Sequence, residues 1–149
     1  MEKRFNIRVY ALIIHNDHIL VTDEHRGKMH MSKFPGGGLE WGEGVADCLK
    51  RECMEEMGQE PVEMEHYYTT EFFVTSAFRE DDQMISIYYT VTLPEPDKLV
   101  TVSEKFAFGK IEDGAQTFRW MPLSSFSDED VTFPIDKFIA QRLKQSTGT

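Results

Sequence analysis

The apolar and polar positions along this chain predict strands over much of its length and helices at two places. The expected strands, each a run rich in β-branched or aromatic residues, cover residues 7–15, 18–22, 66–78, 84–93, 98–102 and 118–121. Asn16 and Asp17 make a turn between the first two strands, and the charged stretch 79–83 is expected to join the next two as an antiparallel pair. Strands before, between and after two helices predict an α/β/α sandwich rather than an all-β fold.

The first helix is expected at about residues 44–57, with Gly58 as its C-cap. At about 100° per residue, its apolar residues fall within one arc roughly 120° wide, and they are Val45, Ala46, Leu49, Cys53 and Met57. Glu52 and Glu56 lie at the edge of this arc. Carboxylates seldom lie against a core-facing stripe unless something pairs with or binds them, so this helix is the first candidate site. The second helix is expected to begin at Pro134, with apolar residues at Ile135, Phe138, Ile139 and Leu143.

The carboxylates of the first helix suggest the chemistry of the site. Glu52, Glu55 and Glu56 stand at i, i+3 and i+4, so their side chains can converge on one side of the helix. Three like charges so close repel each other unless a cation is shared, and oxygen ligands suit Mg²⁺ or Mn²⁺ rather than zinc. Before the helix, residues 34–38 (FPGGG) are expected to form neither strand nor helix, since three glycines let a ligand approach the backbone. The pattern indicates metal-assisted attack of water on phosphorus; the alternative is an exposed acidic face with ordinary ion pairs.

Composition limits the classes of function. At 149 residues, the chain is expected to form one domain spanning residues 1–149. The formal net charge of −10 argues against a binder of polymeric nucleic acid, but leaves room for a small phosphorylated substrate. No apolar run approaches the roughly 18 residues that span a bilayer, and no signal peptide is expected. Cys48 and Cys53 lie on one helix and point in different directions, which predicts reduced thiols and a cytoplasmic protein.

Two further patterns are weaker. Residues 24–33 are the one locally basic stretch, in which Arg26 and Lys28 either contact phosphate or belong to a solvated loop. The histidines show no regular ligand spacing and are expected to be scattered over the surface; they are His15, His18, His25, His30 and His66. Neither pattern by itself predicts a second site.

The stretch 37–59, GGLEWGEGVADCLKRECMEEMGQ, resembles the signature of the Nudix (MutT-like) hydrolases. That signature is G-x5-E-x7-R-E-U-x-E-E-x-G-U, in which U is a bulky aliphatic residue. Every fixed position is matched at the required spacing, by Gly37, Glu43, Arg51, Glu52, Glu55, Glu56 and Gly58. The departures, Cys53 and Gln59, fall at the aliphatic positions and put no catalytic residue in doubt. The resemblance implies the family's α/β fold, a Nudix-type α/β/α sandwich with a mixed central sheet, with residues 37–59 as its Nudix box.

The resemblance also implies roles for the matched residues. Mg²⁺ or Mn²⁺ would be held by the carboxylates of Glu52, Glu55 and Glu56 and by a backbone carbonyl near Gly37. Arg51 would orient neighbouring glutamates, Glu43 among them, by ion pairing. The general base would be Glu52 or Glu55, or an acid from a distant loop.

Beyond the box the resemblance is weaker. Residues 109–123, GKIEDGAQTFRWMPL, look like the loop and strand that carry a further metal-binding or basic glutamate in some members of the family. That residue would be Glu112, with Asp113 or Glu104 as alternatives. Asp136, near the start of the last helix, either accepts hydrogen bonds from a base amine or is explained by the helix dipole.

The activity that the resemblance implies is that of a pyrophosphohydrolase cleaving the diphosphate linkage of a nucleoside diphosphate joined to another group. A nucleoside or deoxynucleoside triphosphate, giving the monophosphate and pyrophosphate, is the favoured substrate; ADP-ribose or a sugar nucleotide is the alternative. A Nudix-fold sensor that binds a nucleotide without cleaving it is an alternative of another class, disfavoured because every box glutamate is present. Whether the chain forms a homodimer is left open.

Overall fold

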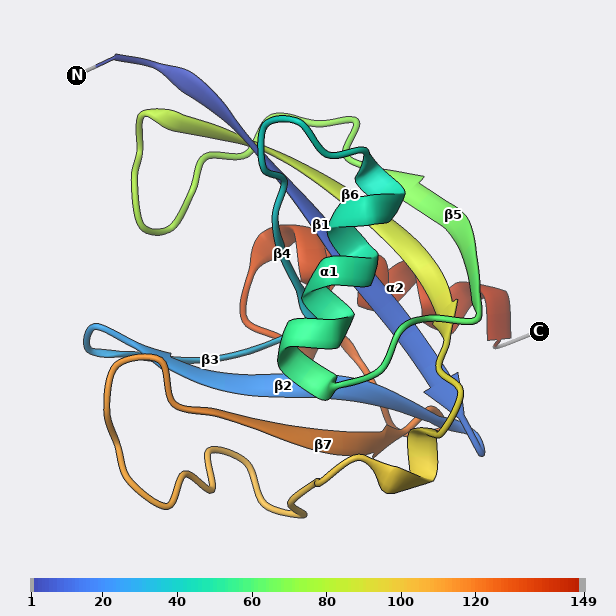
Figure 1. Ribbon diagram of the computed structural model, residues 1–149. Helices are drawn as coiled ribbons and strands as arrows, with labels where there is room; N and C mark the ends of the chain where they lie inside the picture. The colour runs from blue at the N-terminus through green and yellow to red at the C-terminus, as the bar shows by residue number, and fades with distance from the viewer. Residues whose placement is uncertain (1, 148–149) are drawn as a thin grey trace. The chain divides into compact units, whose positions relative to one another are not determined.

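The computed structural model describes residues 2–147 and shows, over this range, seven strands and two α-helices (Figure 1). The strands are β1 (Arg4–His15), β2 (His18–Arg26), β3 (Met29–Lys33), β4 (Gly36–Gly38), β5 (Glu63–Thr69), β6 (Asp82–Thr92) and β7 (Gln116–Pro122). The helices are α1 (Val45–Met57) and α2 (Pro134–Thr147), and short 3-10 turns lie at Pro96–Lys98 and Asp128–Asp130. The chain divides into two compact units, Met1–Ile13 with Pro35–Pro96 and Ile14–Phe34 with Asp97–Thr149.

The first unit contains a mixed group of strands and the helix α1. β1 pairs in parallel with β6, while β4 pairs with β1 and β5 with β6 in the antiparallel sense. Parallel neighbours need a long crossover, and β4, α1 and β5 all lie between β1 and β6 in the chain. α1 lies against β4 (Figure 1). The best-buried side chains of this unit, at most 1% exposed, include Val9, Ala11, Leu49, Cys53 and Tyr88.

Helix α1 has the ends that the sequence predicts. At its start the backbone N–H of Gly44 donates to the carboxylate of Asp47 at 3.1 Å. At its end Gly58 takes the left-handed conformation, with φ of 70°, and its N–H donates to the carbonyl of Met54. The expected apolar arc is its inner face, although Cys48 is buried as well and Val45, Ala46 and Met57 are only half-buried.

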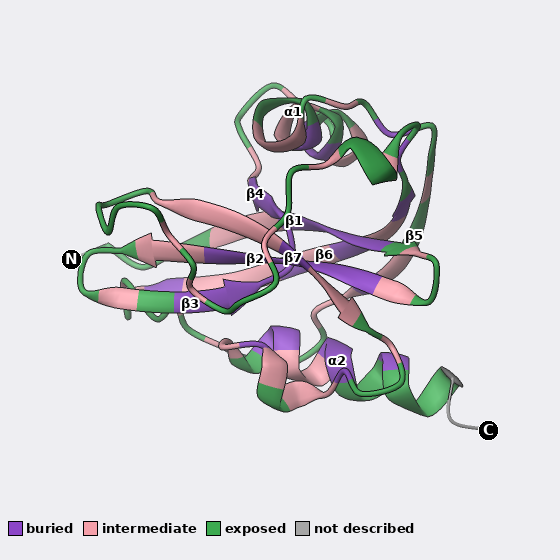
Figure 2. Cartoon of the chain, turned by 90° about the horizontal axis from the view of Figure 1, so that it is seen from below, coloured by how far each residue is buried: buried purple, intermediate pink, exposed green. Residues whose placement is uncertain are grey.

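The second unit is organised around β2, with which β3 and β7 pair in the antiparallel sense. Its core includes Ile19, Leu20 and Val21, none of which is exposed. Helix α2 begins at Pro134 as predicted, and the buried segments along it are drawn in purple in Figure 2. These buried residues recur about every four positions, as expected for one helix face, and are Ile135, Asp136, Ile139, Ala140 and Leu143.

The expectation that residues 34–38 form no strand is wrong, because Gly36–Gly38 is β4. In β4, Gly36 lies opposite Tyr10 and Gly37 opposite Val9 of β1. Strand pairing uses backbone groups, which glycine also possesses. A Cβ on Gly36 would overlap the carbonyl oxygen of Val9, so glycine is what allows this close approach.

Two strand predictions and one loop prediction also need correction. The expected strand 66–78 begins earlier and ends at Thr69; residues 70–81 lie outside the named strands, and Phe73 is 72% exposed. The aromatic content favours a strand there, but strand propensity depends on packing against neighbours, and the ring of Phe73 lacks it. Residues 98–102 form no strand. The basic stretch 24–33 is not a loop, because β2 continues to Arg26 and β3 begins at Met29. None of the helices within residues 2–147 combines the length and apolarity needed to cross a membrane.

Candidate active site

Arg51 connects the glycine-rich strand to helix α1. Its guanidinium donates two hydrogen bonds to the carboxylate of Glu43, from Nε to Oε2 at 3.0 Å and from Nη2 to Oε1 at 2.7 Å. Nη2 also donates to the carbonyl oxygen of Gly38 at 3.1 Å. A forked arginine–carboxylate pair is among the stronger polar contacts in proteins. The ion pair expected between Arg51 and Glu43 is therefore present. The further bond to Gly38 links Arg51, and with it helix α1, to the end of β4.

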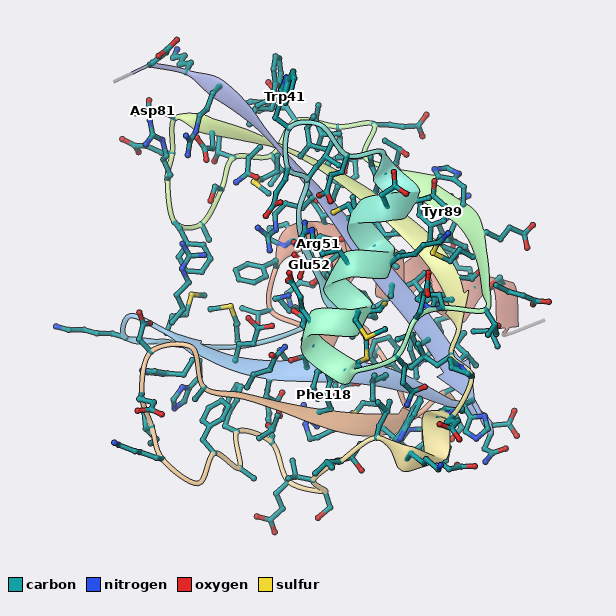
Figure 3. All side chains as sticks on the ribbon, in the orientation of Figure 1. Trp41, Arg51, Glu52, Asp81, Tyr89 and Phe118 are labelled. Carbon is teal, nitrogen blue, oxygen red and sulfur yellow. The ribbon has the colours of Figure 1, made fainter. Side chains whose placement is uncertain are left out.

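Glu43 is fixed from two sides. Besides Arg51, its Oε1 accepts the backbone N–H of Glu40 at 2.9 Å. The hydrogen bonds from Arg51 and then from Glu40 lower the pKa of Glu43 to about 2, from an ordinary 4.5. The same contact raises the pKa of Arg51. Between Glu40 and Glu43 the chain turns through Trp41, which is fully exposed, and Gly42, whose φ is 98°. Figure 3 shows the Trp41 side chain pointing away from the strands.

Glu52 lies directly against the glycine strand. A Cβ on Gly37 would lie 2.6 Å from Oε2 of Glu52 and closer still to its other carboxyl atoms. Arg51 Nη1 donates to Glu52 Oε1 at 2.9 Å, and the Glu52 side chain is 14% exposed. Figure 3 shows Arg51 and Glu52 on the same side of α1. The absence of a side chain at position 37 thus makes the space that the Glu52 carboxylate fills.

The other two box glutamates differ in exposure. Glu55 is 59% exposed and accepts one hydrogen bond from Arg51 Nη1, at 3.3 Å. Glu56 is half-buried, and its Oε2 atom is buried. The carboxylate oxygens of Glu52 beside Gly37 are ligands of the kind that Mg²⁺ and Mn²⁺ prefer. As the side chains stand, no three His, Cys, Asp or Glu residues among residues 2–147 are grouped so that they could hold a metal.

The two cysteines of α1 are free thiols, as predicted. Burial raises the pKa of both Cys48 and Cys53 to about 12. Cys48 Sγ lies 3.5 Å from the carbonyl oxygen of Gly38. Thiols that stay protonated are poor nucleophiles, so these residues serve packing rather than catalysis.

The remaining predicted site residues lie in the second unit. Glu112 is exposed in the loop before β7, where Lys110 Nζ lies 3.5 Å from its Oε2. Arg26 and Lys28 are exposed on either side of Gly27, at the turn of the β2–β3 hairpin. Asp136 is 3% exposed, in the first turn of α2.

The structure also contains a buried ion pair that the sequence does not predict. Arg119 donates from Nε to Oδ2 of Asp23 at 2.6 Å and from Nη2 to Oδ1 at 2.9 Å. Ser32 donates to the same carboxylate at 2.7 Å. Asp23 and Arg119 are far apart in the chain, so no local spacing could have revealed the pair. The sequence signal that was available is an Asp inside an apolar strand, which requires a partner.

Comparison with known proteins bears on the family and the fold. The model of the NUDIX domain matches residues 4–141. A NUDIX hydrolase from Nitrosomonas europaea is 19% identical, with 95% of this chain and 88% of that chain covered and a TM-score of 0.67. A structure described as MutT, from work on Aliivibrio salmonicida and Vibrio cholerae, is 18% identical, with coverage of 95% and 98% and a TM-score of 0.64. A structure described as an ADP compounds hydrolase is 16% identical, with coverage of 96% and 75% and a TM-score of 0.64. Among curated protein sequences, none matches the chain significantly.

These likenesses confirm the predicted fold class. The solved structures share the α/β fold over most of this chain, and at such low identities they speak for the fold alone. Family membership rests on the domain match, which includes the whole of the box at residues 37–59. This chain belongs to the NUDIX family and is a hydrolase of its pyrophosphohydrolase class.

Proposed function

We propose that the chain cleaves the diphosphate linkage of a nucleoside or deoxynucleoside triphosphate, giving the monophosphate and pyrophosphate, with Mg²⁺ or Mn²⁺ as cofactor. The observation that carries the proposal is the Glu52 carboxylate packed against Gly37 in the space that a Cβ would fill. This contact puts the Glu52 carboxylate beside β4, and carboxylate and backbone carbonyl oxygens are the ligands that a hard cation prefers. The triphosphate is favoured because residues 109–123 resemble the loop and strand of the family members that cleave nucleoside triphosphates.

The metal would be held by Glu52, Glu55 and Glu56 together with the carbonyl of Gly37. When bound, it supplies charge neutralisation at the phosphates and lowers the pKa of a water. Arg51 keeps Glu52 against Gly37 by its bond at 2.9 Å. Glu55 must turn away from Arg51, and an exposed i,i+4 ion pair contributes only about 0.3–0.5 kcal/mol. The attraction between the metal and the carboxylates that converge on it would offset this small cost.

The general base is proposed to be Glu52, Glu55 or the loop residue Glu112. Asp113, the alternative to Glu112, accepts the backbone N–H of Gly27 at 2.6 Å and so already has a structural role. Arg26 and Lys28 are proposed as phosphate contacts because they are the exposed cations of the hairpin turn. Asp136 is the proposed base contact.

Three broader parts of the proposal also come from the sequence. One domain over residues 1–149 is supported by the continuous match of the family model. The net charge of −10 supports a small nucleotide rather than a polymeric nucleic acid as partner. The free thiols of Cys48 and Cys53 support a cytoplasmic location. ADP-ribose or a sugar nucleotide is the second candidate substrate, supported by the likeness to an ADP compounds hydrolase.

A panel of nucleoside triphosphates, ADP-ribose and sugar nucleotides, incubated with the protein and Mg²⁺, tests the proposal. Release of pyrophosphate from a triphosphate is the expected result, and release of AMP from ADP-ribose would select the second candidate. Glu56→Gln should lose turnover by at least about 10²-fold, because a ligand charge is removed. Glu60→Gln, an exposed glutamate just beyond the helix, is the matched control and should keep wild-type turnover.

Two results would contradict the proposal. If no compound is cleaved but one raises the melting temperature, the chain is a nucleotide sensor rather than a hydrolase. If folded Glu56→Gln keeps wild-type turnover, Glu56 is not a metal ligand.

A further inference from the structure

Two histidines face each other across the β2–β3 hairpin. His25 of β2 lies directly opposite His30 of β3. The backbone N–H and C=O of His25 bond in the other direction, to Ala115 O and from Gly114 N, both at 2.9 Å. Because the backbone of His25 is bonded away from β3, His25 and His30 form a non-hydrogen-bonded pair of the antiparallel ladder. In such pairs the side chains of the two strands lie closest together. The position of the turn at Gly27 therefore makes the two imidazoles converge.

The rings converge through one particular atom of each. Nδ1 of His25 lies 2.8 Å from Nδ1 of His30, and the ring centroids are 4.7 Å apart. In the neutral pair one Nδ1 carries a proton and donates it to the other. If the donor ring moves its proton to Nε2, each Nδ1 has a free lone pair directed toward the other ring, and a rotation of the two rings would aim both lone pairs at one ion beside them.

Aromatic rings hold this arrangement in place. The His30 ring packs against Phe106 at 4.9 Å and against Phe108 at 5.4 Å between centroids. Phe106 has a positive φ of 57°, which is rare for a bulky residue. Its N–H donates to Oδ2 of the fully buried Asp23 at 3.1 Å, which helps to hold this unusual conformation. The loop before β7 is thus fixed against the histidine pair, as outer groups fix the ligands in metal sites.

We propose that His25 and His30 form a binding site for a nitrogen-preferring divalent metal ion, with Cu²⁺ or Ni²⁺ favoured. Imidazole suits these ions, whereas Mg²⁺ prefers oxygen. With metal–nitrogen bonds of about 2.0–2.1 Å, two ligands at 90° lie about 2.9 Å apart, close to the observed 2.8 Å. A tetrahedral ion would need about 3.3 Å between the same atoms. Water completes the coordination, since no third His, Cys, Asp or Glu in residues 2–147 joins the pair.

The site is separate in chemistry from the glutamate box and does not depend on the proposed function. The box offers carboxylates to a hard cation, while the hairpin offers two imidazole nitrogens. Bound metal would cross-link β2 to β3 beside the turn that carries Arg26 and Lys28. A cross-link that exists only in the folded protein raises its stability in proportion to occupancy.

Calorimetric titration of the untagged full chain with Ni²⁺, in the presence of excess Mg²⁺ to occupy the carboxylates, tests the site. One Ni²⁺ per chain is expected for the wild type. His25→Gln and His30→Gln should each weaken binding by at least about tenfold, because one of two protein ligands is lost. His66→Gln is the matched control, since His66 is also an exposed strand histidine whose ring is hydrogen-bonded, to Thr69 at 2.8 Å.

The Cu²⁺ form gives an independent readout. Its electron paramagnetic resonance spectrum should show coupling to two equivalent ring nitrogens in the wild type and to at most one in either single variant. Thermal unfolding without metal confirms that each variant is folded. Equal Ni²⁺ binding by the double variant His25→Gln/His30→Gln, or no binding by the folded wild type, would overturn the proposal.

Discussion

Replacing Gly37 with alanine should separate activity from stability. Gly37 has no φ in the left-handed region, so alanine brings no backbone strain, and the three atoms nearest to its Cβ all belong to the carboxylate of Glu52. Ordinary contacts begin at 3.4 Å, whereas the new Cβ would lie 2.6 Å from Glu52 Oε2. The carboxylate must therefore move by roughly 1 Å. Because it is the end of a flexible side chain, it can move without disturbing the fold.

The consequences for turnover and for stability differ in size. A displacement of roughly 1 Å in a catalytic group costs about 10²-fold in rate, or about 2.7 kcal/mol of transition-state stabilisation. The displaced Glu52 also loses its bond from Arg51, at about 1–1.5 kcal/mol, while alanine restricts the unfolded chain by about 0.4–1 kcal/mol. The net change in the free energy of unfolding should stay below about 1 kcal/mol. The rate effect is the larger of the two.

The assay compares kcat on the preferred nucleotide with the urea midpoint for each variant. Gly38→Ala is the matched control, because its Cβ would lie at an ordinary 3.6 Å from Arg8 Nη1. Gly38→Ala should keep both kcat and stability near wild type. If Gly37→Ala keeps wild-type kcat while folded, the Glu52 carboxylate need not lie against Gly37, and the reasoning about the site is refuted.

Two further predictions concern Glu43 and Glu112. Arg51 lowers the pKa of Glu43 in the folded protein to about 2, from an ordinary 4.5. The ionised carboxylate of Glu43 therefore stabilises the fold above pH 4.5, and this stabilisation is lost as the pH falls towards 2. The melting temperature of the wild type should exceed that of Glu43→Gln at neutral pH, and the gap should close over this range; a constant gap would contradict the ion pair. Glu112→Gln should lower turnover by about 10²-fold, as for a lost general base, with an unchanged melting temperature because Glu112 is exposed. An unchanged rate would make Glu112 an ordinary loop residue.

Local sequence predicted the central part of the candidate site well, because that part is local. Glu43 and Arg51 are eight residues apart, and a helix that starts between them brings their side chains together. Gly58 could be assigned as a C-cap because the left-handed conformation is a property of one residue. The buried arc of α1 followed from helical periodicity alone. What the spacing did not reveal is that the carbonyl of Gly38 also accepts from Arg51.

Strand predictions failed where burial depends on a distant partner. Residues 70–81 have strand-like composition, yet Phe73 stays exposed because no face covers it. Residues 36–38 have none of that composition, yet they form β4 because β1 offers its backbone to them. The sequence predicts scattered histidines, because a loop over residues 24–33 would give His25 and His30 no fixed partners. Placing the turn at residues 27–28 would have set them opposite each other.

The sequence by itself determined the family, the box and the helix that carries it, since these rest on spacing within one short stretch. Only the tertiary structure decided that Glu52 fills the space beside Gly37 and that Asp23 meets Arg119. In both contacts the two residues lie on different elements, so neither helical nor strand periodicity in the sequence predicts that they meet. Their physical reason is packing: a missing Cβ leaves room for a carboxylate, and a buried charge requires a partner from wherever the fold supplies one.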